Sequence, residues 1–213
     1  LLAPVLDRSR FVYVCRDPRD MALSWKKAPA LRGGVVRAAG IWAEDQMGFA
    51  RLCAELQSVT GKPIPYLTYE RLLQNPVESL SVVCAESGLD FDTKMLEFHD
   101  ITFPQPGASP VAEWQNLARP LMTGNTGKFR EELSSDEVRY VETVCHESMA
   151  ALGYVPDYPL LTDNECQAMR QRLETLEPWH KPSYDRLPES ERLKRRRQHE
   201  VFLRIRSRPW KIT

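Results

Sequence analysis

Short apolar runs alternate with longer stretches of helical periodicity along the first third of the chain. Arg10 to Cys15 is a β-branched and aromatic run, which predicts a buried strand. Asp17 is a good helix cap, and the following proline suits a first helical position, so a helix is expected from Pro18 to about Lys27. A long amphipathic helix is then expected from about Val36 to Val59, and a second short strand from Ile64 to Thr68.

The second half contains further helix starts. Asn75 followed by Pro76 predicts a helix that ends near Gly88. Ser134 and Glu137 form a capping box before an apolar stripe of helical spacing, which indicates core packing. Residues 163–176 are compatible with one more helix. Beyond Pro178 the chain is polar, basic and interrupted by prolines, and we expect an extension or a tail that follows the surface.

Strands that alternate with helices predict an α/β fold built on a parallel sheet. Ligands of such sheets bind beyond the carboxyl ends of the strands. Arg16 directly follows the first predicted strand, so it occupies that kind of position.

Composition is ordinary for a globular protein, but charge is unevenly distributed. The 213 residues are 42% hydrophobic and 27% charged, with a formal net charge of zero. No run approaches the ~20 apolar residues that span a bilayer, so no membrane partner is expected. Residues 181–213 hold 11 Lys/Arg against 4 Asp/Glu, whereas the preceding residues hold 18 against 25. A basic tail therefore follows a mildly acidic body.

The five cysteines indicate neither a metal centre nor a disulfide framework. Their number is odd and no two have zinc-site spacing, so we expect no metal. Free thiols in apolar stretches favour structural roles in a reducing compartment, and we expect a cytoplasmic location.

Arg16 and Ser24 are the first candidates for ligand binding. An arginine at the end of a strand can grip a phosphate through two hydrogen bonds, and a hydroxyl on the following helix can donate to the same phosphate. Composition alone favours a different interpretation, in which Arg16 pairs with Asp17 or Asp20 and Ser24 is merely exposed.

The whole segment RFVYVCRDPRDMALSW, residues 10–25, resembles the sulfotransferases that use 3′-phosphoadenosine 5′-phosphosulfate (PAPS) as donor. In that family the corresponding Arg and Ser hold the 3′-phosphate. The resemblance therefore implies this role for Arg16 and Ser24. Arg19 and Asp20 match the motif too, and we interpret them as residues of the helix start and the scaffold.

A second match is LTYERL followed by an Asn-Pro pair, residues 67–76. The family's tyrosine there lies near the adenine, which implies a base contact for Tyr69. A half-buried core tyrosine is an equally open interpretation. Glu70 is expected to make a structural hydrogen bond or ion pair. Phe103 is a further candidate for a position against the adenine.

The third match is GNTGKFR, residues 124–130, which resembles the family's Gly-x-x-Gly-x-Trp-Lys loop over the nucleotide. Glycines let the backbone approach a phosphate closely, and backbone amides with a nearby cation form an anion site. The resemblance implies nucleotide contacts for a set of four residues: Gly124, Gly127, Lys128 and Arg130. Phe129 replaces the family's tryptophan, and Met122-Thr123 stands where animal cytosolic members carry Arg-Lys. Arg119, Lys128 or Arg130 could bind the phosphate in place of that Arg-Lys pair.

The resemblance covers about Arg10 to Tyr154 and carries expectations about fold and organisation. It implies a three-layer, P-loop-like α/β fold with a central parallel sheet flanked by helices. Residues 1–158 would form the C-terminal part of the sulfotransferase domain, and residues 159–213 a helical, basic C-terminal extension. The family's 5′-phosphosulfate loop has no match here and is expected before Leu1, so the chain alone is expected to be inactive.

The implied activity is transfer of a sulfuryl group from PAPS to a hydroxyl or amine of a small-molecule or carbohydrate acceptor. No residue is identified as the general base, although four histidines are available: His99, His146, His180 and His199. Two alternatives remain open. One is a non-catalytic sulfotransferase-like protein. The other is a nucleic-acid or anionic-surface binding protein that uses the basic run 194–197, although no nucleic-acid motif is found and no such partner is expected.

Overall fold

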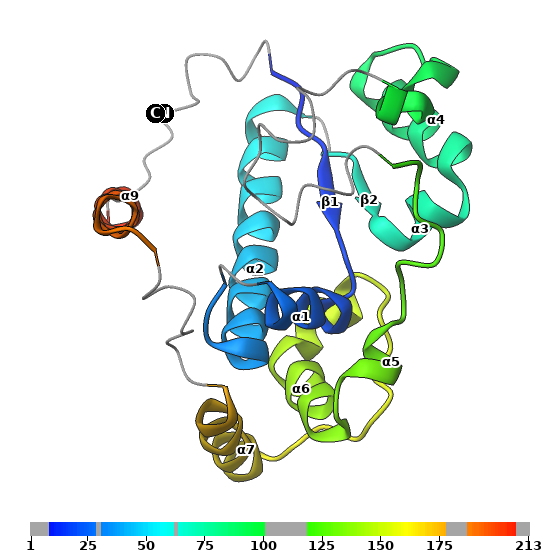
Figure 1. Cartoon of the computed structure of the whole chain (residues 1–213). Coiled ribbons are helices and arrows are strands. Elements are labelled where there is room, and N and C mark those ends of the chain that lie inside the picture. The colour runs from blue at the N-terminus through cyan, green and yellow to red at the C-terminus, as the bar shows by residue number, and fades with distance from the viewer. Residues whose placement is uncertain (1–8, 29–30, 62–63, 101–118, 178–186, 208–213) are drawn as a thin grey trace.

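The computed structural model of the chain describes residues 9–28, 31–61, 64–100, 119–177 and 187–207. Figure 1 shows its elements. Their bounds, in chain order, are β1 (Tyr13–Cys15), α1 (Pro18–Lys27), α2 (Gly34–Thr60), β2 (Tyr66–Thr68), α3 (Tyr69–Gln74), α4 (Pro76–Ser87), the 3₁₀ segment η2 (Thr93–Asp100), α5 (Phe129–Glu132), α6 (Ser135–Ala151), α7 (Asp163–Leu176) and α9 (Glu189–Arg206).

Three helices, α1, α2 and α6, pack against one another and form the centre of the described structure (Figure 1). Ala38 and Ala39 are small and fully buried, which lets α2 approach its neighbours closely. Leu173 of α7 packs into the same cluster. The core cluster includes Ala22, Leu23, Val35, Ala38, Ala39, Trp42, Phe129, Val138, Val141, Cys145, Met149 and Leu173.

The expected three-layer α/β fold with a central parallel sheet is wrong. The chain is mostly helical, and the sheet that the structure describes has only two strands, β1 and β2. The two strands do pair in parallel, with Tyr13 opposite Tyr66 and Cys15 opposite Thr68. Pairing stops there because Asp17 and Thr68 are the caps of the next helices.

Side-chain exposure explains why these strands do not form a central layer. Parallel sheets are normally covered on both faces, but Val14 of β1 and Tyr66 of β2 are 55% and 56% exposed. The sequence predicts a buried strand for the first apolar run, yet only Cys15 at the end of β1 is buried. The residues of the buried core cluster come mainly from helices instead, so helix packing forms the core.

Local helix signals agree closely with the observed bounds. The Asp17 side chain accepts a hydrogen bond from the Arg19 amide at 2.9 Å and starts α1 where the sequence predicts it. The predicted capping box at Ser134 is confirmed: its hydroxyl accepts from the Glu137 amide, and the Glu137 carboxylate accepts from the Ser134 amide at 2.9 Å.

Glu137 is also a stability determinant. Its Oε1 is 2.6 Å from the Lys26 ammonium of α1, so the capping residue of α6 also ties two helices together. Burial alone would raise the pKa of Glu137, but the bonds from Lys26 and Ser134 outweigh burial and lower the pKa. A carboxyl whose folded pKa is lowered stabilises the protein above its unfolded pKa, and this contribution disappears as pH falls through the folded value.

We expect Glu137→Gln to destabilise the chain by about 1–2 kcal/mol near pH 7, because the bonds to Lys26 and Ser134 lose the contribution of the carboxylate charge. The difference from the wild type should shrink as pH falls through the lowered pKa of Glu137, where the wild-type carboxyl becomes protonated. Urea unfolding from pH 7 down to the most acidic pH at which the chain stays folded measures the effect. A difference that keeps the same size over this whole range would contradict the charge-based explanation.

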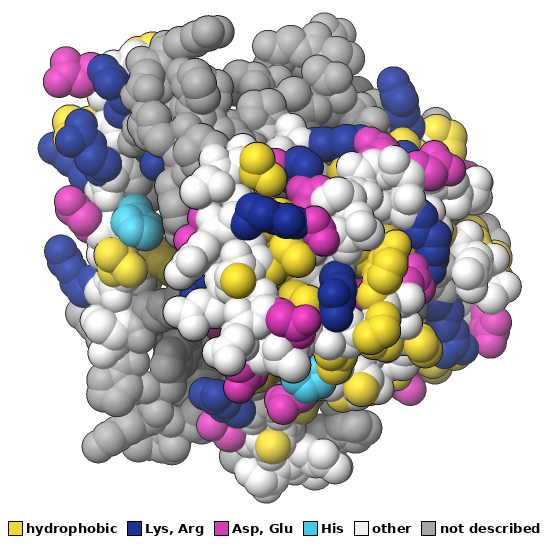
Figure 2. Space-filling view, turned by 90° about the horizontal axis from the view of Figure 1, so that it is seen from below, with side chains coloured by type: hydrophobic (Ala, Val, Ile, Leu, Met, Phe, Trp, Pro, Cys, Tyr) yellow, Lys and Arg dark blue, Asp and Glu magenta, His cyan; other side chains and the backbone are white. Residues whose placement is uncertain are grey.

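Helix α3 is not among the elements expected from the sequence. Tyr69–Gln74 forms the short helix α3, capped by the Thr68 side chain. The basic tail contains the 18-residue helix α9. Figure 2 shows Lys and Arg side chains gathered over α9 at the left edge of the view. Within the described residues, no helix combines the length and apolar character needed to cross a membrane.

Candidate functional site

Arg16 lies between the end of β1 and the start of α1, and its main chain is held firmly. The indole Nε1 of Trp42, on α2, donates a hydrogen bond to the Arg16 carbonyl at 3.0 Å. Trp42 itself is buried in the helical core. The core therefore sets the position from which the Arg16 side chain extends.

The guanidinium of Arg16 meets two segments that are distant in sequence. Its NH2 group donates to the backbone carbonyl of Asn125 at 2.8 Å, across 109 residues. The guanidinium also lies over the ring of Tyr69, 4.7 Å from the ring centroid. Asn125 and Tyr69 also contact each other, because Nδ2 of Asn125 donates to the Tyr69 hydroxyl at 3.0 Å. Arg16, Tyr69 and Asn125 thus form a compact cluster, here called the Arg16 cluster.

One donor of the Arg16 cluster is unsatisfied. The Nε of Arg16 is buried and has no hydrogen-bond partner among the described residues. A buried donor without a partner is costly, and more so when it carries charge. An anion, or a movement that admits one, would satisfy this group.

The glycine-containing loop 124–130 is anchored to the start of α1 by Asp20. The Asp20 carboxylate, 1% exposed, accepts hydrogen bonds from the Gly127 amide at 2.6 Å and the Phe129 amide at 3.1 Å. Gly127 has φ of 72°, in the left-handed region that favours glycine. The second half of the loop is therefore fixed to the first turn of α1.

Arg19 is a structural residue, as the sequence interpretation expects. It is 4% exposed and forms two hydrogen bonds to the Asp17 carboxylate, at 2.9 and 2.7 Å, and one to Glu142 at 2.6 Å. Burial alone would lower the pKa of Arg19, but Asp17 and Glu142 outweigh burial and raise it. Its guanidinium also lies 4.3 Å from the ring centroid of Phe129, which adds a second anchor for the loop.

Glu70 likewise makes the structural hydrogen bonds expected of it. One carboxylate oxygen accepts from the Asp17 amide at 3.0 Å, and the other accepts from the Tyr154 hydroxyl at 2.8 Å. Burial, reinforced by Glu70, raises the pKa of Tyr154 well above its usual value. Glu70 therefore connects the end of β2 to the turn between β1 and α1 and to the segment after α6.

The other candidate residues are less tightly grouped. Ser24 is exposed on α1, and no side-chain hydrogen bond of Ser24 is found in the described part of the chain. Lys128 is exposed at the cap of α5. The Arg130 guanidinium forms an ion pair with the Asp157 carboxylate, with an N–O distance of 3.1 Å. Gly124 has open space around its α-carbon. Arg119 is exposed, and Phe103 lies outside the described residues.

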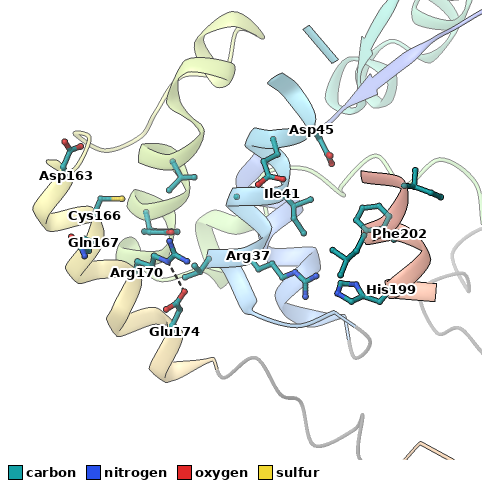
Figure 3. Close-up of a pocket in the computed structure, with 17 residues that line it drawn as sticks. Arg37, Ile41, Asp45, Asp163, Cys166, Gln167, Arg170, Glu174, His199 and Phe202 are labelled. Carbon is teal, nitrogen blue, oxygen red and sulfur yellow. Dashed lines mark hydrogen bonds and ion pairs between the residues drawn. The ribbon is translucent and has the colours of Figure 1, made fainter. Parts of the chain in front are cut away.

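A cavity is lined by residues outside the Arg16 cluster. This cavity of about 1060 Å³ opens between α2, α6, α7 and α9 (Figure 3). Its walls carry Arg37 and Ile41 from α2, the paired Arg170 and Glu174 from α7, and His199 from α9. The mixture of charged and apolar side chains indicates no single ligand class.

The described histidines lie on three different elements, η2, α6 and α9. His146 is exposed on α6 and its Nδ1 is 2.9 Å from the Thr143 carbonyl oxygen. His99 belongs to η2, and His180 lies outside the described residues. No general base is therefore assigned. In the residues with described positions, no group of His, Cys, Asp or Glu side chains has an arrangement that could hold a metal ion.

Asn125 is the member of the Arg16 cluster that sequence reasoning missed. It fills a variable position of the loop, so neither its residue type nor its spacing marks it. Its importance depends on contacts with Arg16 and Tyr69, which follow separate strands.

No protein-family model matches the chain, and comparison with curated protein sequences finds no significant relative.

Proposed function

We propose that the Arg16 cluster binds the 3′-phosphoadenosine part of PAPS and that the chain supplies this part of the donor site of a sulfotransferase. The observation that carries the proposal is the convergence of the three resembling motifs. Arg16 of the first contacts Tyr69 of the second and Asn125 of the third. If the three short motifs resembled the family only by chance, there would be no reason for them to lie together around one arginine.

The chemistry of the cluster supports an anionic, aromatic ligand. Arginine gives charge-assisted hydrogen bonds to phosphate, and the Arg16 Nε still needs an acceptor. Tyr69 brings an aromatic ring beside that cation, as expected for a residue close to a nucleobase. The exposed Lys128 ammonium adds a cation on the glycine-containing loop.

The proposed reaction is an in-line displacement at sulfur. An acceptor oxygen or nitrogen forms the new bond to sulfur, the bond from sulfur to the 5′-phosphate oxygen breaks, and adenosine 3′,5′-bisphosphate leaves. The acceptor proton passes to a base that is not assigned. The acceptor class is a hydroxyl or amine on a small molecule or carbohydrate. Cations of the cluster would stabilise charge on the departing nucleotide.

The cytoplasmic, reducing location belongs to the same proposal. All five cysteines are free thiols, and burial raises the pKa of Cys145 to about 12, which keeps it protonated and unreactive.

The alternative is a binding protein that uses its basic helix. Seven Lys/Arg side chains against three Asp/Glu lie within α9, and this excess of positive charge favours anionic surfaces. The two functions predict that binding responds to different substitutions. Nucleotide binding by the Arg16 cluster should respond to Arg16 and be selective for the 3′-phosphate, whereas binding by α9 should respond to its own arginines.

The test is the affinity of the protein for two nucleotides. Arg16→Ala should weaken adenosine 3′,5′-bisphosphate about ten- to a hundredfold and adenosine 5′-monophosphate little, because only the former carries the 3′-phosphate. Isothermal titration calorimetry measures both. Arg51→Ala, at an exposed site on α2, is the matched control and should leave both affinities unchanged. Equal losses for the two nucleotides would refute the assignment.

A further inference from the structure

We infer that Asn125 is a positioning residue that holds the glycine-containing loop closed over Arg16 and competes with the ligand's phosphate. This inference rests on the proposed function and assigns a role to a residue that matches no part of the family motif. It predicts that removing the Asn125 side chain makes nucleotide binding tighter, which is unusual for a residue in a binding site.

The backbone carbonyl of Asn125 occupies a position that a phosphate oxygen would use. It accepts from the Arg16 NH2 group at 2.8 Å, an ordinary distance for a bond from guanidinium to oxygen. The adjacent Nε is shielded from solvent and has no hydrogen-bond partner among the described residues. An anion that grips Arg16 through both nitrogens would therefore compete with the Asn125 carbonyl for the NH2 group.

The Asn125 side chain holds that carbonyl in place. Nδ2 donates to the Tyr69 hydroxyl at 3.0 Å, while the Tyr69 ring lies beneath the guanidinium. Tyr69 is the first residue of α3, a helix whose start is held by the Thr68 side chain. The bond between the Asn125 and Tyr69 side chains, here called the latch, therefore joins the loop to a capped helix.

The two halves of the loop differ in their attachment. Gly127 and Phe129 are fixed to Asp20 through two backbone hydrogen bonds. Asn125 is held by the latch, by its carbonyl bond to Arg16 and by a turn in which its amide donates to Met122 at 3.0 Å. Loss of the latch would free the half that covers Arg16, while the Asp20 anchor would keep the other half in place.

A closed loop reduces the observed affinity. If only a fraction of the molecules is open, the apparent dissociation constant rises by the inverse of that fraction. Since the latch is one hydrogen bond between neutral side chains, removing it should shift the equilibrium by about three- to tenfold.

The experiment uses adenosine 3′,5′-bisphosphate as the probe, with calorimetry on four proteins: wild type, Asn125→Ala, Tyr69→Phe and the double variant. Tyr69→Phe removes the hydroxyl and keeps the ring. Each single variant should bind about three- to tenfold more tightly than wild type, and the double variant no more tightly than either, because both remove one bond. Asn75→Ala is the matched control, since Asn75 is exposed and makes no side-chain cap bond. Circular dichroism verifies the fold of each protein.

The outcomes separate this inference from the proposed function. If wild type binds in an Arg16-dependent way while Asn125→Ala and Tyr69→Phe bind equally or more weakly, the latch is refuted and the proposed function stands. If only the two variants bind, the latch is supported in its strongest form. If none of the four proteins binds the bisphosphate, both ideas are overturned.

Discussion

Arg19→Met should destabilise the chain by about 3–5 kcal/mol, because it leaves two buried carboxylates without their cation. Asp17 holds Arg19 through two bonds, and Glu142 is fully buried on α6. Methionine fills similar space but carries no charge, so the buried Glu142 carboxylate would keep only the amides of Asp157 and Tyr158 as partners. For a domain of this size the loss corresponds to a fall in Tm of roughly 6–20 °C.

Urea unfolding measures this effect, and Arg172→Met is the matched control. Arg172 pairs with Asp136 at the surface, where both side chains are largely exposed, so its loss should cost less than about 1 kcal/mol. Replacing Glu142 together with Arg19, as Arg19→Met with Glu142→Leu, should recover part of the loss. Equal effects of Arg19→Met and Arg172→Met would show that the buried charges do not matter as inferred.

Phe129→Ala is expected to cost a similar amount, about 3–5 kcal/mol. Phe129 is 1% exposed, belongs to the core cluster and lies beneath the Arg19 guanidinium, so alanine leaves a cavity and removes a cation–π contact. Phe129 also belongs to the glycine-containing loop, and the same change should therefore loosen the Arg16 cluster.

Chemical denaturation and nucleotide calorimetry together test this second expectation. Phe129→Leu keeps most of the buried volume and should cost only about 1–2 kcal/mol. Phe98→Ala serves as the control, because Phe98 is half-buried in η2 and outside the core cluster. A loss for Phe129→Ala no larger than that for Phe98→Ala would contradict its placement in the core.

Helix starts could be predicted because their signals are local. Asp17 accepts from an amide two residues later, and Ser134 exchanges bonds with Glu137, so a few adjacent residues contain the whole interaction. The helix over 163–176 is found with the expected bounds for the same reason: Thr162 and Glu165 form a capping box at its start.

The candidate site was only partly predictable. Likeness to a family motif identified Arg16, Tyr69 and the loop 124–130, and the structure brings these segments together. The same likeness does not reveal that Arg130 pairs with Asp157, or that Asp20 anchors the loop. Those contacts join residues that a motif treats separately. The role of Ser24 in phosphate binding stays a prediction.

The sequence by itself determined where most helices begin, that the two short strands run parallel, and which residues have side chains that can bind an anion. These features could be predicted because capping, periodicity and the order of strands and helices depend on residues that are close together in the sequence. Only the tertiary structure decided that helices α1, α2 and α6, rather than a sheet, form the core, and that Asn125 lies on Arg16. These outcomes depend on packing between segments that are distant in sequence. The arrangement that buries the most apolar area is the most stable one, and short-range sequence patterns do not show which arrangement that is.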